Sequence, residues 1–120
     1  MLYYNWTVGG KDYKCRLTAR ACVDLEKKLG ENPLNVFIKI ANANGALPSV
    51  GDMVTILHAS LQSMEHGITL DRAYELYDQY VDEGHTLVEF IPVILEIFKV
   101  SGFFNEEAEG KNAQQGVAIQ

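Results

Sequence analysis

The feature that most constrains this chain is the apolar segment 87–100, which reads LVEFIPVILEIFKV. Its only residues other than Leu, Val, Ile and Phe are Glu89, Pro92, Glu96 and Lys99, spaced three, four and three apart. At about 100° per residue, this spacing puts them on one narrow stripe of a helix. Most of the helix surface is therefore apolar, and it must be covered on several sides, either by its own domain or by another chain.

The residues before this segment predict a mainly α-helical domain that begins with a β-hairpin. Residues 2–8 and 11–17 are strand-like, and Gly9-Gly10 between them suits a tight hairpin turn. Helices are expected at residues 19–29, 33–42, 50–65, 70–83 and 87–100. Each begins after a capping residue, and Thr86 with Glu89 has the spacing of a capping box. Pro92 should kink the last helix or loosen its first turns.

Length and composition favour one globular domain. The chain has 120 residues, of which 48% are hydrophobic and 22% charged. We expect residues 1–104 to form a single helical domain with an N-terminal hairpin, and residues 105–120, which hold few core-forming side chains, to be a disordered tail. The first residues do not read as a signal peptide, and no apolar run is long enough to span a bilayer. A cytoplasmic location, with no membrane partner, is therefore expected.

The charge is acidic and unevenly distributed along the chain. The net charge is −6; residues 1–39 hold seven Lys/Arg against four Asp/Glu, and residues 40–120 hold three against twelve. Nucleic-acid-binding domains are usually basic, so a nucleic-acid partner is not expected. The imbalance fits self-association or a basic partner, and it fits equally well a chance distribution over solvated surfaces.

Candidate catalytic groups are scarce. Two cysteines, Cys15 and Cys22, fit no zinc motif, and we expect both to be free thiols. Glu89 and Glu96 share a helix face but lie about 10 Å apart along the axis, too far for a coupled acid–base pair.

The histidines also form no pattern typical of a metal site. His58 and His66 are eight residues apart, and His85 precedes another helix. A metal site needs three or four converging ligands, so capping or surface positions are the simpler interpretation. We expect no catalytic residue, no cofactor, no metal and no enzymatic activity.

Two apolar surfaces are candidates for contact with other proteins. The stripe Tyr74, Tyr77 and Tyr80 is interpreted as core, with a contact surface as the alternative. The segment 87–100 is either a central core helix or the lining of a partner groove or oligomer seam. The candidate protein-binding residues are Phe90, Ile91, Ile94, Ile97, Phe98, Phe103, Phe104 and Tyr77.

Three segments resemble the tail assembly chaperones of siphophages and prophages of Gram-positive bacteria. They are LEKKLGENPLNVF (25–37), VGDMVTILHASLQSMEHGITLDRAYELYDQYVDEG (50–84) and FIPVILEIFKVSGFF (90–104). The resemblance extends over residues 3–104. It implies a mainly helical, non-enzymatic protein that coats the long, helix-prone tape measure protein in the infected cell, brings tail tube subunits to it, and is absent from the mature virion.

From this resemblance we expect a tail assembly chaperone in the host cytoplasm, whose partners are the tape measure protein, the tail tube protein and possible further copies of itself. Binding through apolar helix stripes is an established recognition mode. One alternative is a small acidic regulatory or inhibitory protein that sequesters a basic partner or mimics DNA. A weaker alternative is a small-molecule-binding or catalytic helical domain, which would need a pocket with converging polar groups.

Overall fold

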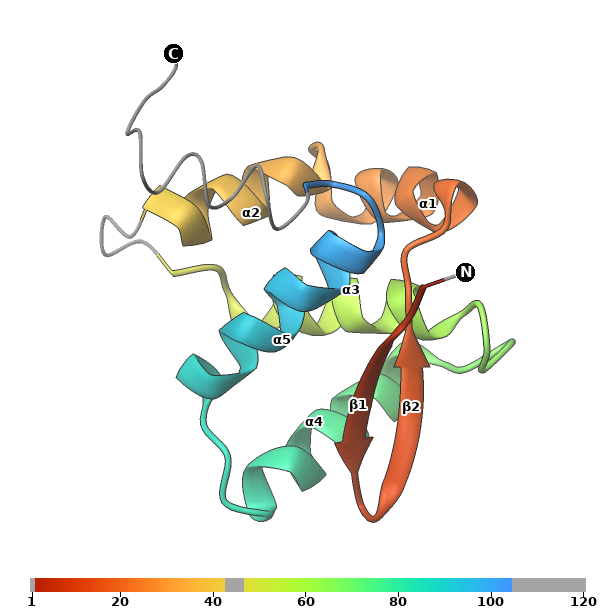
Figure 1. The fold of residues 1–120 in the computed structure, drawn as a ribbon, viewed down its shortest axis with the longest axis vertical. Helices are drawn as coiled ribbons and strands as arrows, with labels where there is room; N and C mark the ends of the chain where they lie inside the picture. Colours follow the sequence, from red (N-terminus) through yellow and green to blue (C-terminus); the bar gives the residue numbers. More distant parts are fainter. Residues whose placement is uncertain (1, 43–46, 105–120) are drawn as a thin grey trace.

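The computed structural model describes residues 2–42 and 47–104 (Figure 1). The elements in chain order are β1 (Tyr4–Val8), β2 (Lys11–Cys15), α1 (Ala19–Leu29), α2 (Pro33–Asn42), α3 (Val50–Leu61), α4 (Leu70–Asp82) and α5 (Leu87–Val100). The predicted fold, an N-terminal hairpin followed by five helices, is confirmed. The predicted tail, residues 105–120, lies outside the described residues.

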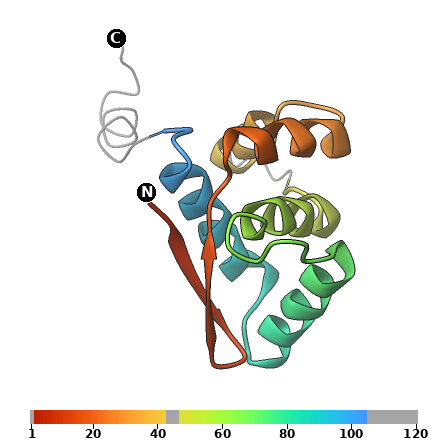
Figure 2. The same ribbon diagram turned by 90° about the vertical axis from the view of Figure 1, so that its right-hand side faces the viewer.

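Helix α3 forms the centre of the domain. It contacts α1, α4, α5 and β2, and Figure 2 shows it between α1 and α4. Every residue from Ile56 to Leu61 is buried, including the polar His58 and Ser60. The apolar segment 87–100 is also largely buried, but it packs against one side of α3. The helix with the longest apolar run is therefore not the central one.

The hairpin covers one side of the helices with its inner face. Strands β1 and β2 pair antiparallel with Val8 opposite Lys11, and both turn glycines have positive φ, 62° and 75°, as a type I′ turn requires. Alternate side chains point inward, so Trp6 and Tyr13 are buried and form a cross-strand aromatic pair. The outward-facing residues of the two strands are Asn5, Thr7, Asp12 and Lys14, all of them exposed.

The helices start where the capping residues predict. Side chains of Thr18, Ser49, Thr69 and Thr86 each accept a hydrogen bond from the main chain three residues on. At α5 the Glu89 carboxylate also accepts from the Thr86 N–H at 2.9 Å, which completes the predicted capping box. These local bonds satisfy main-chain donors that a helix start leaves unpaired.

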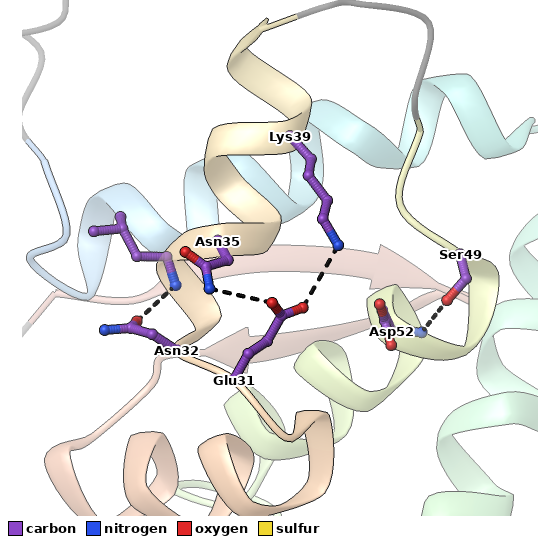
Figure 3. Close-up of polar contacts among 7 residues, drawn as sticks. Glu31, Asn32, Asn35, Lys39, Ser49 and Asp52 are labelled. Atoms are coloured by element: carbon purple, nitrogen blue, oxygen red, sulfur yellow. Dashed lines mark hydrogen bonds and ion pairs between the residues drawn. The ribbon is translucent and has the colours of Figure 1, made fainter.

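The turn between α1 and α2 is held by one carboxylate. Glu31 accepts a hydrogen bond from Asn35 Nδ2 at 3.1 Å and forms an ion pair with Lys39 Nζ at 3.5 Å (Figure 3). The amide oxygen of Asn32 accepts from the Leu34 N–H at 2.8 Å. This network joins the turn to α2.

Helix α3 ends four residues earlier than predicted, at Leu61 rather than Glu65. The Gln62 side chain turns back, and its Nε2 donates to the carbonyl oxygens of His58 at 3.3 Å and Ile68 at 3.0 Å. The N–H of Glu65 still bonds to Leu61 at 2.8 Å, so residues 62–65 form turns in place of a further regular helical turn.

Proline inside α5 is tolerated because of where it lies. The helix runs through Pro92 to Val100. Proline has no N–H, so the Val88 carbonyl loses its partner four residues on. Both Val88 and Pro92 are exposed, which lets water bond to that carbonyl.

Candidate functional site

The structure places most of the predicted protein-binding residues of α5 in the core of the domain. Phe90, Ile94, Ile97 and Phe98 are each 0% exposed, because they pack into the domain's own core. Tyr77, from α4, is also buried, with its ring centroid 5.1 Å from that of Phe90. These five side chains stabilise the fold and cannot contact a partner while the domain is intact.

The other predicted contact residues are partly buried. Ile91, Phe103 and Phe104 all pack against the core. The ring of Phe103 lies edge-on to that of Phe98, with centroids 4.8 Å apart. The pair at 103–104 therefore folds back on the domain.

A half-open groove of about 600 Å³ lies between α1 and the C-terminal part of α3. Its floor includes Leu25 and Ala59, both buried, and its rim carries the exposed Arg20, Asp24 and Lys28 from successive turns of α1. The groove is more apolar than polar. Its remaining lining residues are Tyr3, Thr18, Ala21, His58, Gln62, Ser63 and His66.

His58 connects the groove to the core. It is 8% exposed, with Nε2 2.9 Å from the Ile68 carbonyl oxygen and Nδ1 3.4 Å from Lys28 Nζ. These distances fit a neutral ring that donates from Nε2 and accepts from Lys28 at Nδ1. Burial lowers the pKa of His58; the Lys28 ammonium also lowers it, and the hydrogen bond to Ile68 acts in the opposite direction.

The lowered pKa of His58 predicts a loss of stability in mild acid. Unfolded, the ring takes up a proton near pH 6.5, whereas folding keeps it neutral to lower pH, so acid favours the unfolded state. Above about pH 6.5 the ring is neutral in both states and adds no pH dependence. Urea denaturation at about pH 7.5 and about pH 5.5 should show a larger loss of stability for the wild type than for His58→Gln. Equal losses would contradict this prediction.

One polar atom in the groove is unpaired. Ser63 Oγ is buried and has no hydrogen-bond partner within the part of the chain that the structure describes. An unsatisfied buried hydroxyl costs about 1–3 kcal/mol, so Ser63 lowers the stability of the fold beside the groove.

Both cysteines are free thiols, as predicted. Burial raises the pKa of Cys15 to about 12, although Ser60 acts in the opposite direction. Burial also raises the pKa of Cys22, and the negative charge of Glu26 raises it by a smaller amount. Thiolate is the reactive form of cysteine, so neither thiol is activated as a nucleophile.

Sequence reasoning missed the groove because it treated His58 as a capping or surface residue. A signal was present: His58 lies four residues after Val54 and three before Leu61, on the apolar face of the same helix. In residues 2–42 and 47–104, no three His, Cys, Asp or Glu side chains are grouped as metal ligands. None of the helices described for this chain has the length and apolar character needed to cross a membrane.

Residues 5–117 match DUF6096, a family of unknown function. The chain belongs to this family. The match includes nearly all of β1 and every later strand and helix, so DUF6096 corresponds to the hairpin and the five helices together. Searches among curated proteins and among solved structures find no match to the chain.

Proposed function

We propose that this member of DUF6096 is a phage tail assembly chaperone that binds the tape measure protein and brings tail tube subunits to it. It acts in the host cytoplasm, catalyses no reaction, and dissociates from the tape measure protein before the virion is complete. The groove between α1 and α3 carries this proposal. A groove between helices, with an apolar floor and a charged rim, suits the apolar face of a partner helix.

The resemblance to tail assembly chaperones includes most of this groove. Segment 25–37 contains Leu25 and Lys28, and segment 50–84 contains His58 and the other groove residues of α3 and of the turn after it. The likeness therefore extends to a surface that is open to a partner.

The rim gives the groove a means of selecting its partner. Arg20 and Lys28 carry positive charge, and Asp24 between them carries negative charge, at successive i, i+4 positions. A helix with complementary charges beside its apolar stripe would bind in one register. Many copies along one elongated partner would gain from multivalency even where each groove binds weakly.

Co-expression with a candidate tape measure protein from the same genome tests the proposal. Ala21 lies in the groove and is half-buried, whereas Ala19 lies on the same helix, exposed and outside the groove. We expect Ala21→Phe to fill the groove and to lower the amount of co-purified tape measure protein at least tenfold. Ala19→Phe is the matched control and should leave co-purification unchanged.

Thermal unfolding of both variants shows whether a loss of binding comes from a loss of fold. Lys28→Glu, which reverses one rim charge without filling the groove, is a second variant and should also weaken binding. If the wild-type chain neither co-purifies with the tape measure protein nor keeps it soluble, the proposed function is wrong. If the wild-type chain co-purifies with the tape measure protein and keeps it soluble, and Ala21→Phe binds it equally well, the groove is not the binding surface.

The exposed face of α4 favours a second candidate, a protein that sequesters a basic partner. Its acidic side chains Asp71, Glu75, Asp78 and Asp82 are exposed, and only Glu75 is paired within the described structure, with Arg72 at 3.2 Å. The double variant Asp78→Lys with Asp82→Lys should abolish binding to a basic partner and leave binding in the α1–α3 groove unchanged.

A further inference from the structure

The end of α5 lies beside one end of the α1–α3 groove. Ser101, the residue directly after α5, accepts a hydrogen bond from the Leu17 N–H at 2.8 Å. Leu17 is followed by Thr18, which caps α1 and lines the groove. Both views of the fold show the last turn of α5 next to the start of α1 (Figure 1, Figure 2). The chain after Phe104 therefore continues from a point near the Thr18 end of the groove.

Residues 105–120 are long enough to follow the whole groove. Helix α1, which forms one side of the groove, has 11 residues and is about 16 Å long. An extended chain spans up to about 3.3 Å per residue, so residue 117 can lie up to about 43 Å from Phe104. The match to DUF6096 continues past α5 to residue 117. The sequence shared by the family therefore includes a segment after the last helix that can reach this groove.

The order of side chains in this segment matches the order of groups along the groove. Residues 106–109 read EEAE, and residues 117–119 read VAI. From the Thr18 end, the groove presents first the exposed Arg20, in the first turn of α1, and then the buried Leu25 of its floor. A segment that enters at this end can place its carboxylates beside Arg20 and its apolar side chains on the floor.

We propose that residues 105–120 bind in the α1–α3 groove of their own chain, with residues 106–109 beside Arg20 and residues 117–119 on the floor. A tether of about a dozen residues gives an effective concentration on the order of 1 mM, so even a weak contact is populated. A partner then binds only if its affinity is high enough to displace the segment. This inference rests on the groove of the proposed function being a binding surface, but not on the identity of the partner.

Charge and connectivity favour this occupant over a second copy of the chain. Residues 105–120 hold three glutamates and one lysine, whereas residues 1–39, which include α1, hold seven Lys/Arg against four Asp/Glu. The net charge of −6 opposes the association of two copies. A segment of the same chain meets Arg20 and Lys28 on the rim without bringing two acidic domains together.

Disulfide exchange in the full chain measures this contact without any partner. Asp24→Cys with Ala118→Cys places one thiol on the groove rim and one in the segment. Glu26→Cys with Ala118→Cys is the matched control, because Glu26 is exposed on the other side of α1 and its replacement also removes one negative charge. Both variants carry Cys22→Ser, and Cys15 is buried. In a glutathione buffer, we expect the effective concentration of the Asp24 pair to be at least tenfold higher than that of the control.

Substitutions in the segment itself test which side chains bind. Adding Val117→Asp with Ile119→Asp should reduce the Asp24 cross-link to the level of the control, whereas Val117→Leu with Ile119→Leu should preserve it. These four changes leave every residue of the described domain in place, and thermal unfolding checks the fold of the α1 variants. Equal cross-linking at Asp24 and Glu26 would overturn the inference, as would a cross-link that the aspartates do not reduce. The cross-link is measured on the chain alone, so failure to bind the tape measure protein would leave its result unchanged.

Discussion

Phe90→Ala is expected to lower the free energy of unfolding by about 3–5 kcal/mol. The side chain is 0% exposed, and its ring centroid lies 5.1 Å from that of Tyr77, 5.5 Å from Tyr80 and 5.9 Å from Trp6. Truncation therefore leaves a cavity where α4, α5 and the hairpin meet. For a domain of this size the melting temperature should fall by roughly 15–30 °C. Urea denaturation and a thermal melt measure both quantities.

Val88→Ala is the matched control on the same helix. Val88 is 64% exposed, so its truncation should change the free energy of unfolding by no more than about 0.5 kcal/mol. The comparison also decides between the two interpretations of the segment 87–100. If Phe90→Ala leaves stability within about 1 kcal/mol of the wild type, then Phe90 is not a core residue and the structural assignment is wrong.

Arg16→Met is expected to cost about 2–3 kcal/mol, because Arg16 joins three parts of the fold. Its Nη1 donates to the carbonyl oxygens of Val100 at 2.8 Å and Leu2 at 3.0 Å, and its main-chain N–H donates to Ser60 at 2.9 Å. The guanidinium also lies at the C-terminus of α5, where a positive charge is favourable. Methionine keeps much of the apolar stem and removes only the donors and the charge.

Arg20→Met controls for the loss of a surface arginine, since Arg20 is exposed on α1. It should change the free energy of unfolding by less than about 0.5 kcal/mol in chemical denaturation. Ser101→Ala completes a double-mutant cycle, because Ser101 Oγ accepts from the Leu17 N–H at 2.8 Å at the same junction. We expect a coupling energy of about 0.5–1.5 kcal/mol. Additive effects would show that the two contacts are independent.

The local features of the fold were predictable from neighbouring residues. Gly9-Gly10 between two strand-like runs predicts the hairpin, and Thr18, Thr69 and Thr86 predict three helix starts. These signals work because a tight turn or a helix cap needs groups only two or three residues apart. The end of α3 was predicted four residues too late because it depends on Gln62 bonding across a loop to Ile68.

The candidate site depends on which helices are neighbours, and the sequence pattern alone does not contain that information. Apolar periodicity in the segment 87–100 shows that the helix must be covered, but not whether its own domain or a partner covers it. The structure shows that Phe90, Ile94, Ile97 and Phe98 are covered by the domain itself. The groove, in turn, exists only because α1 lies beside α3, which brings Lys28 within 3.4 Å of His58.

By itself, the sequence determined the element order, the hairpin turn, the helix caps and the need to bury the last helix. All of these arise from interactions within a few residues or from the period of one helix. Tertiary packing alone decided that α3 is central, that four of the five predicted contact residues of α5 are core, and that an open groove lies between α1 and α3. The physical reason is that burial is a property of neighbours distant in sequence, and many apolar surfaces fit one another about equally well until the whole chain is packed.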